Sequence, residues 1–470
     1  KPDGDNSNTG LNWDTAYRNI YYALIMIKSD SLHPNTINVA EGFYSPSTTG
    51  EFFALGGKEY ISIIGAGKNE TILDAEQTSK LFTIKGVSNF FLQELRLQHG
   101  YSSIGGISMS SNSSPHFKDI CLIDNNGDFV SHVNCYQNNS IFENVIIKTN
   151  YEQVNAKAVE CGNQSNPVFI NCTIEGNKTN PQYGHFGANV NGNLCYPVFI
   201  NCNIIDNYGD IASGIRQGGG HIYLINCTIC DNDHCSQGTI SLVFDAHITL
   251  INTILRNEPA TEIWFHPSYD PNSATLEYCN IEGGSLAVAI NNNGTLNWGE
   301  GNIDEDPMFV GGDPFSYELL PGSPCIDAGN PDTTGLNLPE LDLAGKPRIY
   351  NGRIDIGAYE WQGQGIDEPD TSFINKLYLF QNTPNPFKDK TEILFITADY
   401  ERVKDYTLSI YNVKGQLVRK YSGRNHNFWV KTDIVWDGTD EDGNKVSPGV
   451  YFYKLIYGDN SVTKKMILVR

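Results

Sequence analysis

The sequence has few basic residues, few methionines and no long apolar run. Among its 470 residues, 32 are Lys or Arg and 54 are Asp or Glu, so the formal net charge is −22 at pH 7. A chain this acidic repels a nucleic-acid backbone, and we expect no nucleic-acid partner. No stretch approaches roughly 18 uninterrupted apolar residues, so we also expect no transmembrane segment.

Strong helix formers are scarce as well, whereas residues that suit turns and strands are abundant. The chain holds 45 Gly, 50 Asn, 25 Tyr and 22 Phe but only 4 Met. Asn and Gly favour turns, and aromatic residues favour strands. The hydrophobic share of 40% is too high for a disordered chain. We therefore predict an all-β protein with many turns, and the length allows two or three domains.

The acidity belongs to one part of the chain. Residues 1–365 hold 17 Lys or Arg against 40 Asp or Glu, a net charge of −23, whereas residues 366–470 hold 15 against 14. The stretch between them is rich in Gly and acidic residues, which is typical of a linker. We predict a first domain over residues 1–361, a linker over 362–375 and a second domain over 376–470.

A repeat runs through the first domain. Residues 169–177 (Phe-Ile-Asn-Cys-Thr-Ile-Glu-Gly-Asn) recur in similar form at 199–207 and 224–232, and weaker copies have their anchors at positions 94, 119, 144, 251 and 278. Neighbouring anchors lie 25 to 30 residues apart. Each copy contains a short alternating strand, which buries its apolar face only by stacking on its neighbours. We predict a right-handed parallel β-helix of roughly eight to ten coils, each adding about 4.8 Å along the axis.

Two residue types recur at fixed places in these copies. Six residues after the anchor stands an asparagine, which tolerates a left-handed turn, so we predict a ladder of stacked amides. The ladder positions are Asn125, Asn150, Asn177, Asn207, Asn232 and Asn257. One residue after the anchor often stands a cysteine, where we expect a buried thiol. These cysteines are Cys172, Cys202, Cys227 and Cys279. Before the repeat, Asp14 is predicted to cap a helix that closes the end of the coils.

The opening and closing segments of the first domain carry further motifs. They lie at residues 12–16 (Asn-Trp-Asp-Thr-Ala), 37–46, 61–67, 71–74, 301–309, 323–329 and 355–360. These segments resemble those of secreted bacterial right-handed parallel β-helix proteins of the pectate-lyase-like superfamily. The resemblance implies the same fold and a secreted protein. It leaves the chemistry open, because the group includes lyases, hydrolases and many non-enzymes.

The second domain carries motifs of its own, at residues 382–387 (Asn-Thr-Pro-Asn-Pro-Phe), 410–416, 436–440, 449–453 and 464–469. They resemble the C-terminal Ig-like sorting domain of type IX secretion and the related flagellar-hook-assembly-type Ig module. The resemblance implies export across the outer membrane and an extracellular or outer-cell-surface location. Short alternating strands separated by turn signals favour a small Ig-like β-sandwich in the same place.

Catalytic residues are harder to find. A lyase acting on uronates needs a basic residue, and between positions 179 and 345 only Arg216 and Arg256 are basic. A glycosidase needs two carboxylates about 5–9 Å apart. Asp206 and Asp231 stand at the same place in adjacent copies, and Arg256 stands there in the next copy. Arg216 and His221 flank three glycines nearby, so these five residues form our candidate catalytic set.

Metal and sugar-stacking sites are further hypotheses. Residues 230–235 (Cys-Asp-Asn-Asp-His-Cys) suit a metal, a local disulfide or packed thiols, and an odd total of 11 cysteines leaves at least one without an intrachain partner. Residues 437–442 supply three Asp for Ca²⁺ or for a hairpin turn. Trp264, Phe265 and Tyr269 suit a sugar-stacking platform or a buried turn. We assign no cofactor, and Ca²⁺ is the alternative.

These patterns together favour a secreted structural or adhesive β-helix protein, located at the cell surface or outside the cell. Such a protein would bind a glycan or another cell-surface partner, or would join further copies of itself through its C-terminal domain. The alternative is a polysaccharide-active enzyme, either a glycoside hydrolase or a lyase, that uses one face of the β-helix.

Overall fold

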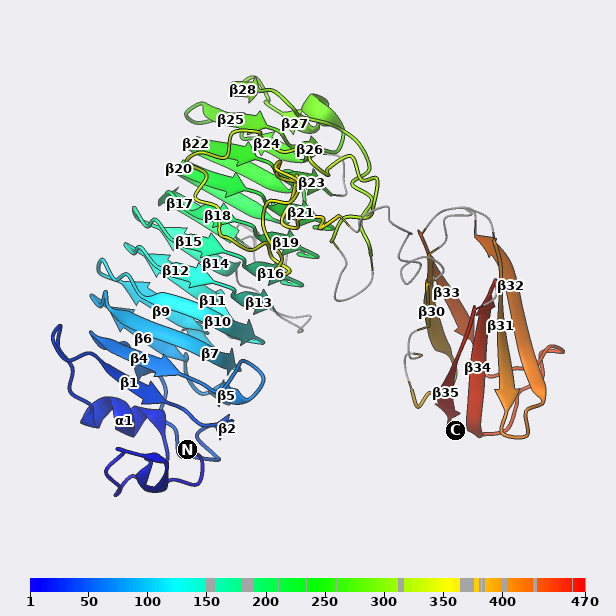
Figure 1. Ribbon diagram of the computed structural model, residues 1–470, viewed down its shortest axis with the longest axis horizontal. Coiled ribbons are helices and arrows are strands. Elements are labelled where there is room, and N and C mark those ends of the chain that lie inside the picture. Colours follow the sequence, from blue (N-terminus) through cyan, green and yellow to red (C-terminus); the bar gives the residue numbers. More distant parts are fainter. Residues whose placement is uncertain are drawn as a thin grey trace. The chain divides into compact units, whose positions relative to one another are not determined.

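The computed structural model forms two compact units (Figure 1), Lys1–Val310 with Tyr317–Gln362 and Gly311–Ser316 with Gly363–Arg470. The described residues are 1–148, 157–178, 190–209, 211–233, 235–257, 261–311, 317–363, 376–379, 382, 385–398, 404–425, 429–458 and 460–469. Within these ranges no helix is long and apolar enough to cross a membrane.

The first unit is a parallel β-helix of about nine turns, with three columns of strands along its length. The first column contains β1 (Asn35–Asn38), β4 (Ile61–Ile64), the start of β7 (Phe90–Gln98) and of β10 (His116–Ile123), β12 (Ile141–Glu143), β15 (Val168–Ile170), β18 (Val198–Ile200), the ends of β20 (Ile215–Ile225) and β22 (Ile240–Ile251), β25 (Asn272–Glu277) and β28 (Gly294–Trp298).

The second and third columns follow in each coil. The second contains β2 (Gly42–Tyr44), β5 (Thr71–Asp74), the ends of β7 and β10, β13 (Ile146–Lys148), β16 (Thr173–Glu175), β19 (Asn203–Ile205), β21 (Thr228–Cys230), β23 (Ile254–Arg256) and β26 (Asn280–Ile281). The third contains β3 (Leu55–Gly56), β6 (Phe82–Lys85), β9 (Ile107–Ser110), β11 (Asn126–Tyr136), β14 (Lys157–Gly162), β17 (Val190–Cys195), the starts of β20 and β22, β24 (Ile263–Phe265) and β27 (Val288–Ala289). One further strand, β8 (Tyr101–Ile104), pairs with the start of β11.

Like residues stack on like residues inside the coils. Phe117, Phe142, Phe169 and Phe199 hold the same inward position of the first column, and their successive ring centroids lie 4.9, 4.6 and 4.6 Å apart. All four rings are fully buried. In-register parallel pairing places each ring directly against the next, so the same residue type packs well at this position in successive coils.

A second stack consists of amides at the turn that follows the second column. The side-chain Nδ2 of Asn177 donates to Oδ1 of Asn207, Asn207 donates to Asn232, and Asn232 donates to Asn257, over 3.1, 2.9 and 3.0 Å. The series ends where Asn257 donates to the buried carboxyl group of Glu262.

The two remaining asparagines of the predicted ladder stand apart from this series. Asn125 donates to the Leu97 carbonyl and accepts the Gly100 amide in an earlier coil. Asn150 lies outside the described residues.

The thiols of Cys172, Cys202, Cys227 and Cys279 form another inward stack beside the first-column turn, and each is fully buried. Thr253 takes the equivalent place between Cys227 and Cys279, because Ile251 pairs with Ile225 two residues earlier. The Thr253 hydroxyl accepts a hydrogen bond from the Cys227 amide. All eleven cysteines carry free thiols, so among the alternatives for residues 230–235 the structure agrees with free thiols and not with a local disulfide.

The N-terminal end is closed by α1 (Ile20–Met26), which buries Ile20, Ala23 and Leu24 against the first coils. The prediction that Asp14 caps this helix is wrong. Asp14 lies in a separate short helix, η1 (Trp13–Thr15), whereas Asn19 caps α1 through the Tyr22 amide. Glu51 also accepts the amides of Ile20 and Tyr21, which satisfies donors that the helix itself leaves free.

Residues 317–362 return along the outside of the last coils and cover apolar side chains there. Leu336 packs on Ile200 and Ile225, and Cys325 and Ile356 pack on Ile205 and Cys230. This closing segment also bonds to the first-column turn, where Asn226 Nδ2 donates to the Asp355 carbonyl over 3.0 Å.

A buried ion pair holds the closing segment together. Arg348 and Glu360 are separated by 3.5 Å and are almost inaccessible to solvent. Arg348 also donates to the Asp355 carbonyl, and Glu360 accepts the backbone amides of Tyr350 and Asp355. Losing either partner would leave an uncompensated charge in the interior, so the pair links the fold of this segment to one arrangement.

The second unit is a sandwich of two antiparallel sheets. One contains β29 (Lys376–Leu379), β30 (Thr391–Ala398) and β33 (Trp429–Trp436), and the other contains β32 (Leu417–Asn425), β31 (Lys404–Asn412), β34 (Gly449–Tyr457) and β35 (Asn460–Leu468). Trp436 lies fully buried in the shared core, between Phe387 and Tyr451. Its indole Nε1 donates to the Thr439 carbonyl, which satisfies its one polar group.

The phenylalanine stack should be a main source of stability. We expect Phe142→Ala to lower the free energy of unfolding by about 3–5 kcal/mol, because it leaves a cavity between two rings that cannot approach each other. Denaturant unfolding followed by circular dichroism measures this change. Phe129→Ala is the control, since that ring is 63% exposed, and a loss of the same size there would contradict a special role for the stack.

Candidate functional site

The two candidate carboxylates, Asp206 and Asp231, lie at equivalent places directly after β19 and β21, both with left-handed backbone. Burial is the main cause that raises the pKa of Asp206, the nearby Lys178 opposes it, and the charge of Asp231 adds to it. Asp231 accepts a 2.7 Å hydrogen bond from the Tyr317 hydroxyl, so the closing segment already occupies one of its oxygens.

Arg256 does not share the position of these two carboxylates, which corrects the sequence prediction. It pairs with Cys230 in the preceding coil, one place before Asp231, and Ile251 pairs with Ile225, so the repeat anchor of this coil is Asn252. This coil has no residue at the left-handed position that Asp206 and Asp231 occupy in the two preceding coils. The ladder residue Asn257 therefore comes directly after Arg256.

The Arg256 guanidinium is also already paired. It lies 3.1 Å from Glu282 and 3.7 Å from Asp304, and it donates to the Glu305 carbonyl. Its charge therefore stabilises the end of the coils.

Arg216 and His221 lie in β20, on either side of the glycine corner that separates the third column from the first. Arg216 is 8% exposed, and burial lowers its pKa. His221 stacks on Tyr223 with ring centroids 4.1 Å apart, and burial is the first cause that lowers its pKa, followed by the charge of His247. The five candidates thus lie on different columns and do not converge on one point.

No group of three or more His, Cys, Asp or Glu side chains could hold a metal ion within the ranges that the structure describes. His234 of the predicted Cys-His segment lies outside those ranges. In the sandwich, Asp437 accepts the amide and hydroxyl of Thr439, and Asp440 accepts the amides of Asp442 and Asn444. These contacts are those of a hairpin turn.

A different group of side chains gathers where the third column turns into the first. Phe244, Tyr269 and Leu194 sit in this corner with positive φ angles of 58°, 78° and 49°, and their side chains are 45%, 58% and 58% exposed. Gly219 lies in the coil between those of Leu194 and Phe244. A Cβ on Gly219 would lie 2.8 Å from the Leu194 side chain, so a glycine at this position leaves space for that side chain.

Four rings at this corner touch in series, and we call them the aromatic ridge: Phe244, Tyr269, His266 and Trp264. Their centroids lie 4.2 Å apart from Phe244 to Tyr269, 4.8 Å from Tyr269 to His266 and 5.3 Å from His266 to Trp264. Of the two alternatives for Trp264, Phe265 and Tyr269, a sugar-stacking platform and a buried turn, Phe265 agrees with the second, because its side chain is fully buried.

The loop that carries the ridge is held from the next coil. Asn293 Nδ2 donates to the carbonyls of His266, Ser268 and Tyr269 over 2.7, 3.3 and 3.3 Å. His266 Nδ1 and the Ser268 amide lie 3.1 Å apart. These bonds set the backbone of residues 266–269, which carries His266 and Tyr269.

Tyr317 anchors the closing segment to Asp231 and offers a direct test of that role. We expect Tyr317→Phe to lower the free energy of unfolding by about 1 kcal/mol, because one hydrogen bond to a carboxylate is lost. Asp231→Asn should cost less, since its amide oxygen still accepts. Thermal unfolding of both variants and of the double variant measures the coupling, and strictly additive losses would contradict a direct bond.

A comparison with known families finds a match in the second unit. Residues 379–469 match the model of the CHU_C Type IX secretion signal domain. This domain points to export and to a cell-surface or extracellular location. A comparison with the curated proteins finds no match.

Among solved structures, two matches are Porphyromonas gingivalis proteins. They are dimeric latent PorU (22% identity, TM-score 0.19) and PorZ, a surface component of the type IX secretion system (23% identity, TM-score 0.14). Each covers 20% of this chain, and the chain spans about a tenth of each, 10% and 11%. The tailspike protein 4 of bacteriophage CBA120 covers 92% of this chain, which spans 61% of it, at 11% identity and a TM-score of 0.26.

Proposed function

We propose that this protein is exported by type IX secretion and binds a glycan outside the cell through the aromatic ridge, without cleaving it. The observation that carries the binding role is the ridge itself, four rings in mutual contact of which Phe244 and Tyr269 are about half exposed. Contiguous exposed apolar groups with polar neighbours are typical of interaction sites.

The chemistry of the ridge favours a sugar chain as the ligand. A sugar ring presents an apolar face and polar edges, and an aromatic side chain such as that of Tyr269 combines the same two properties. Exposed carboxylates lie beside the rings at Asp245 and Asp270, where they would accept hydrogen bonds from hydroxyl groups. The net charge of −23 over residues 1–365 repels anionic polymers, so we propose a neutral glycan.

A binding role fits the surroundings of the ridge better than catalysis does. Glycoside hydrolysis needs two carboxyl groups on either side of one bond. Asp206 and Asp231 belong to the turn after the second column, whereas the ridge lies at the corner between the third and first columns. Asp245 near the ridge is exposed and lies 3.4 Å from His247, an ordinary surface pair.

Export is tested by removing the signal domain. We expect a chain that lacks residues 379–469 to accumulate in the periplasm of a bacterium with type IX secretion, while the full chain reaches the surface or the medium. Immunoblots of cell fractions measure this. Tyr269→Ala in the full chain is the control and should be exported normally. Surface delivery of the truncated chain would contradict the proposed route.

Glycan binding is tested with single substitutions in the ridge. We expect the full chain to bind at least one neutral polysaccharide in affinity electrophoresis, and Tyr269→Ala or Phe244→Ala to weaken that binding about tenfold, the equivalent of about 1.4 kcal/mol of stacking. Tyr269→Phe keeps the ring and should bind nearly as well as the original.

Phe129→Ala is the matched control for this experiment, because it removes a similarly exposed ring from a different part of the β-helix. Equal loss of binding in this control, or no binding to any polysaccharide of a broad neutral panel, would contradict the ridge as the site. Release of reducing ends from a bound polysaccharide would show that the protein is an enzyme.

A further inference from the structure

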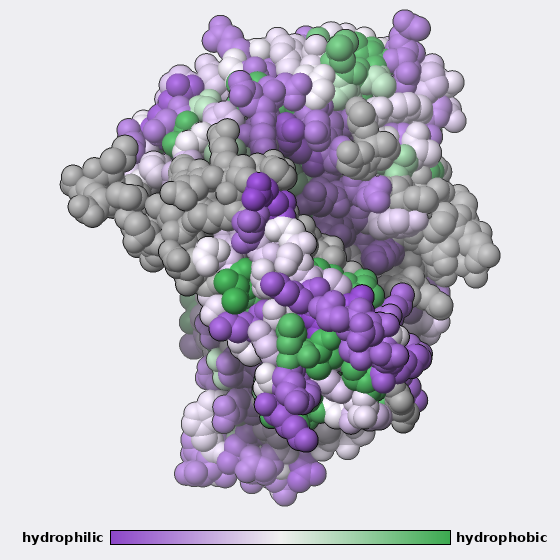
Figure 2. Space-filling view, turned by 90° about the vertical axis from the view of Figure 1, so that its right-hand side faces the viewer, coloured by the Kyte–Doolittle hydropathy of each residue, from purple (hydrophilic) through white to green (hydrophobic). Residues whose placement is uncertain are grey.

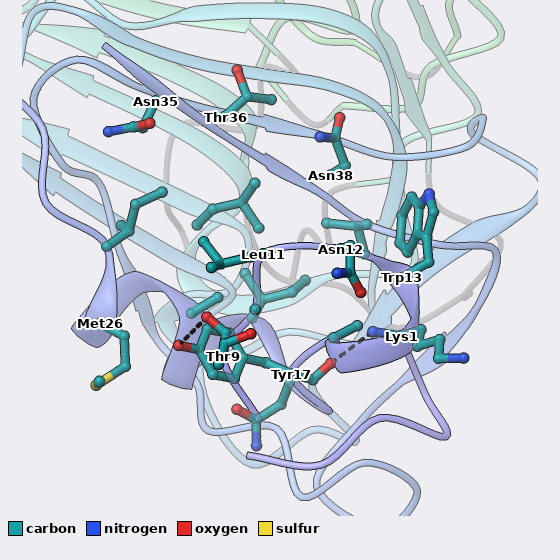
Figure 3. Close-up of a pocket in the computed structure, with 18 of the residues that line it drawn as sticks. Lys1, Thr9, Leu11, Asn12, Trp13, Tyr17, Met26, Asn35, Thr36 and Asn38 are labelled. Atoms are coloured by element: carbon teal, nitrogen blue, oxygen red, sulfur yellow. Dashed lines mark hydrogen bonds between the residues drawn. The ribbon is translucent and has the colours of Figure 1, made fainter. Parts of the chain in front are cut away.

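The two ends of the β-helix differ in how they are covered. At the N-terminal end, α1 and residues 9–13 border β1 around a cavity of about 610 Å³, and Leu11 and Trp13 lie across it from the strand (Figure 3). At the C-terminal end, β28 pairs with β25 on one side only, and no strand of the described residues pairs with its other side. The C-terminal end is therefore the open one.

The hydrogen bonds of β28 show which of its peptide groups are free. The amide of Gly299, just after the strand, donates to the Leu276 carbonyl in β25. In a parallel pair, alternate residues bond to the same neighbour, so the odd-numbered residues of β28 face β25. The peptide groups of Gly294, Leu296 and Trp298 therefore point away from the coils, along the axis of the β-helix.

The sequence does not protect this free edge. Proteins usually blunt an exposed edge with lysine, proline or an inward charge, because an open edge attracts further strands. Residues 283–299, which include β27 and β28, contain no Asp, Glu, Lys, Arg or Pro, although residues 1–365 carry a net charge of −23. Two copies of so acidic a domain repel each other, and an uncharged end is where they can approach most closely.

Apolar side chains accompany the free edge. Leu286 of η3 (Gly284–Ala287) is 94% exposed. Leu296 and Trp298 hold inward positions, opposite the fully buried Ala274 and Leu276, yet they are only partly buried themselves. Figure 2 shows hydrophobic atoms at this upper end of the molecule. An apolar surface depleted of charge is typical of the centre of a protein interface.

From these features we infer that two copies of the chain join through their C-terminal coils, with β28 of one copy antiparallel to β28 of the other. The two-fold axis passes through Leu296. The Leu296 amide of each copy donates to the Leu296 carbonyl of the other, and Gly294 exchanges the same pair of bonds with Trp298 of the second copy. A two-fold contact uses one surface twice, which suits an end that has a single open strand.

The side chains agree with this register. It places Thr295 opposite Asn297 of the second copy, and Glu300, the first charged residue after β28, near the uncharged Asn292. The inward side chains of both strands lie on the same side, so the partly buried Leu296 and Trp298 of each copy cover those of the other. Association stops at two copies, because each chain has one such end.

The test uses the full chain and its mass in solution. We expect the mass measured by light scattering to rise with concentration from that of one chain to that of two, and then to stay constant. Leu11→Ala is the control for the opposite end, where the side chain is 85% exposed, and this variant should dimerise as the original does.

Two double variants test the register. Thr295→Asp with Asn297→Asp places like charges opposite each other across the axis, and we expect a dissociation constant raised roughly tenfold or more. Thr295→Asp with Asn297→Lys is the matched variant, because it places opposite charges there and should dimerise at least as well as the original. Both side chains are exposed, so the coils should tolerate the changes, and thermal unfolding measures whether they do.

Four results would overturn the proposal. They are an original chain that stays monomeric at every concentration, a mass that grows beyond two chains, dimerisation unchanged by the two Asp substitutions, and a folded Asp–Lys variant that dimerises as poorly as the Asp–Asp variant. The last result would contradict the antiparallel register, because a parallel pairing sets each charge against its own copy. Loss of glycan binding leaves this proposal untouched, since the ridge lies on a different part of the β-helix.

Discussion

In-register parallel pairing between neighbouring coils is the constraint on which the rest of the structure depends. It places each residue against the equivalent residue of the next coil, so a repeated side chain must pack well against another side chain of the same type. Phenylalanine meets this condition by stacking its ring, and asparagine meets it because its amide both donates and accepts. The repeats at Phe142, Phe169 and Phe199, and at Asn177, Asn207 and Asn232, follow from that condition.

Stacking alone leaves outward apolar side chains and the first coil uncovered. Segments outside the repeat cover both. Outward Ile200 and Ile225 would expose a strip of apolar surface, and Leu336 in the closing segment covers it. The lumen of the first coil would be open, and α1 closes it with help from the Glu51 carboxylate. These elements use single contacts, such as Arg348 with Glu360, where the coils use repeated ones.

This division explains how far the sequence alone could predict the structure. The coils and most of the stacked asparagines and cysteines could be predicted, because stacking repeats a residue type at a visible period. Arg256 was assigned wrongly because one coil lacks a turn residue, and a single deletion shifts the register without changing the apparent spacing. The contact between Asp231 and Tyr317 joins residues far apart in the chain, and the ridge rings stand at irregular intervals, so no period could reveal either.

The direction of the strands also limits how such a molecule can meet its partners. All strands of the β-helix run parallel, so its two ends differ, and two identical ends cannot continue the same register. At the N-terminal end α1 covers the first coil, so the stacking that joins neighbouring coils does not continue past it.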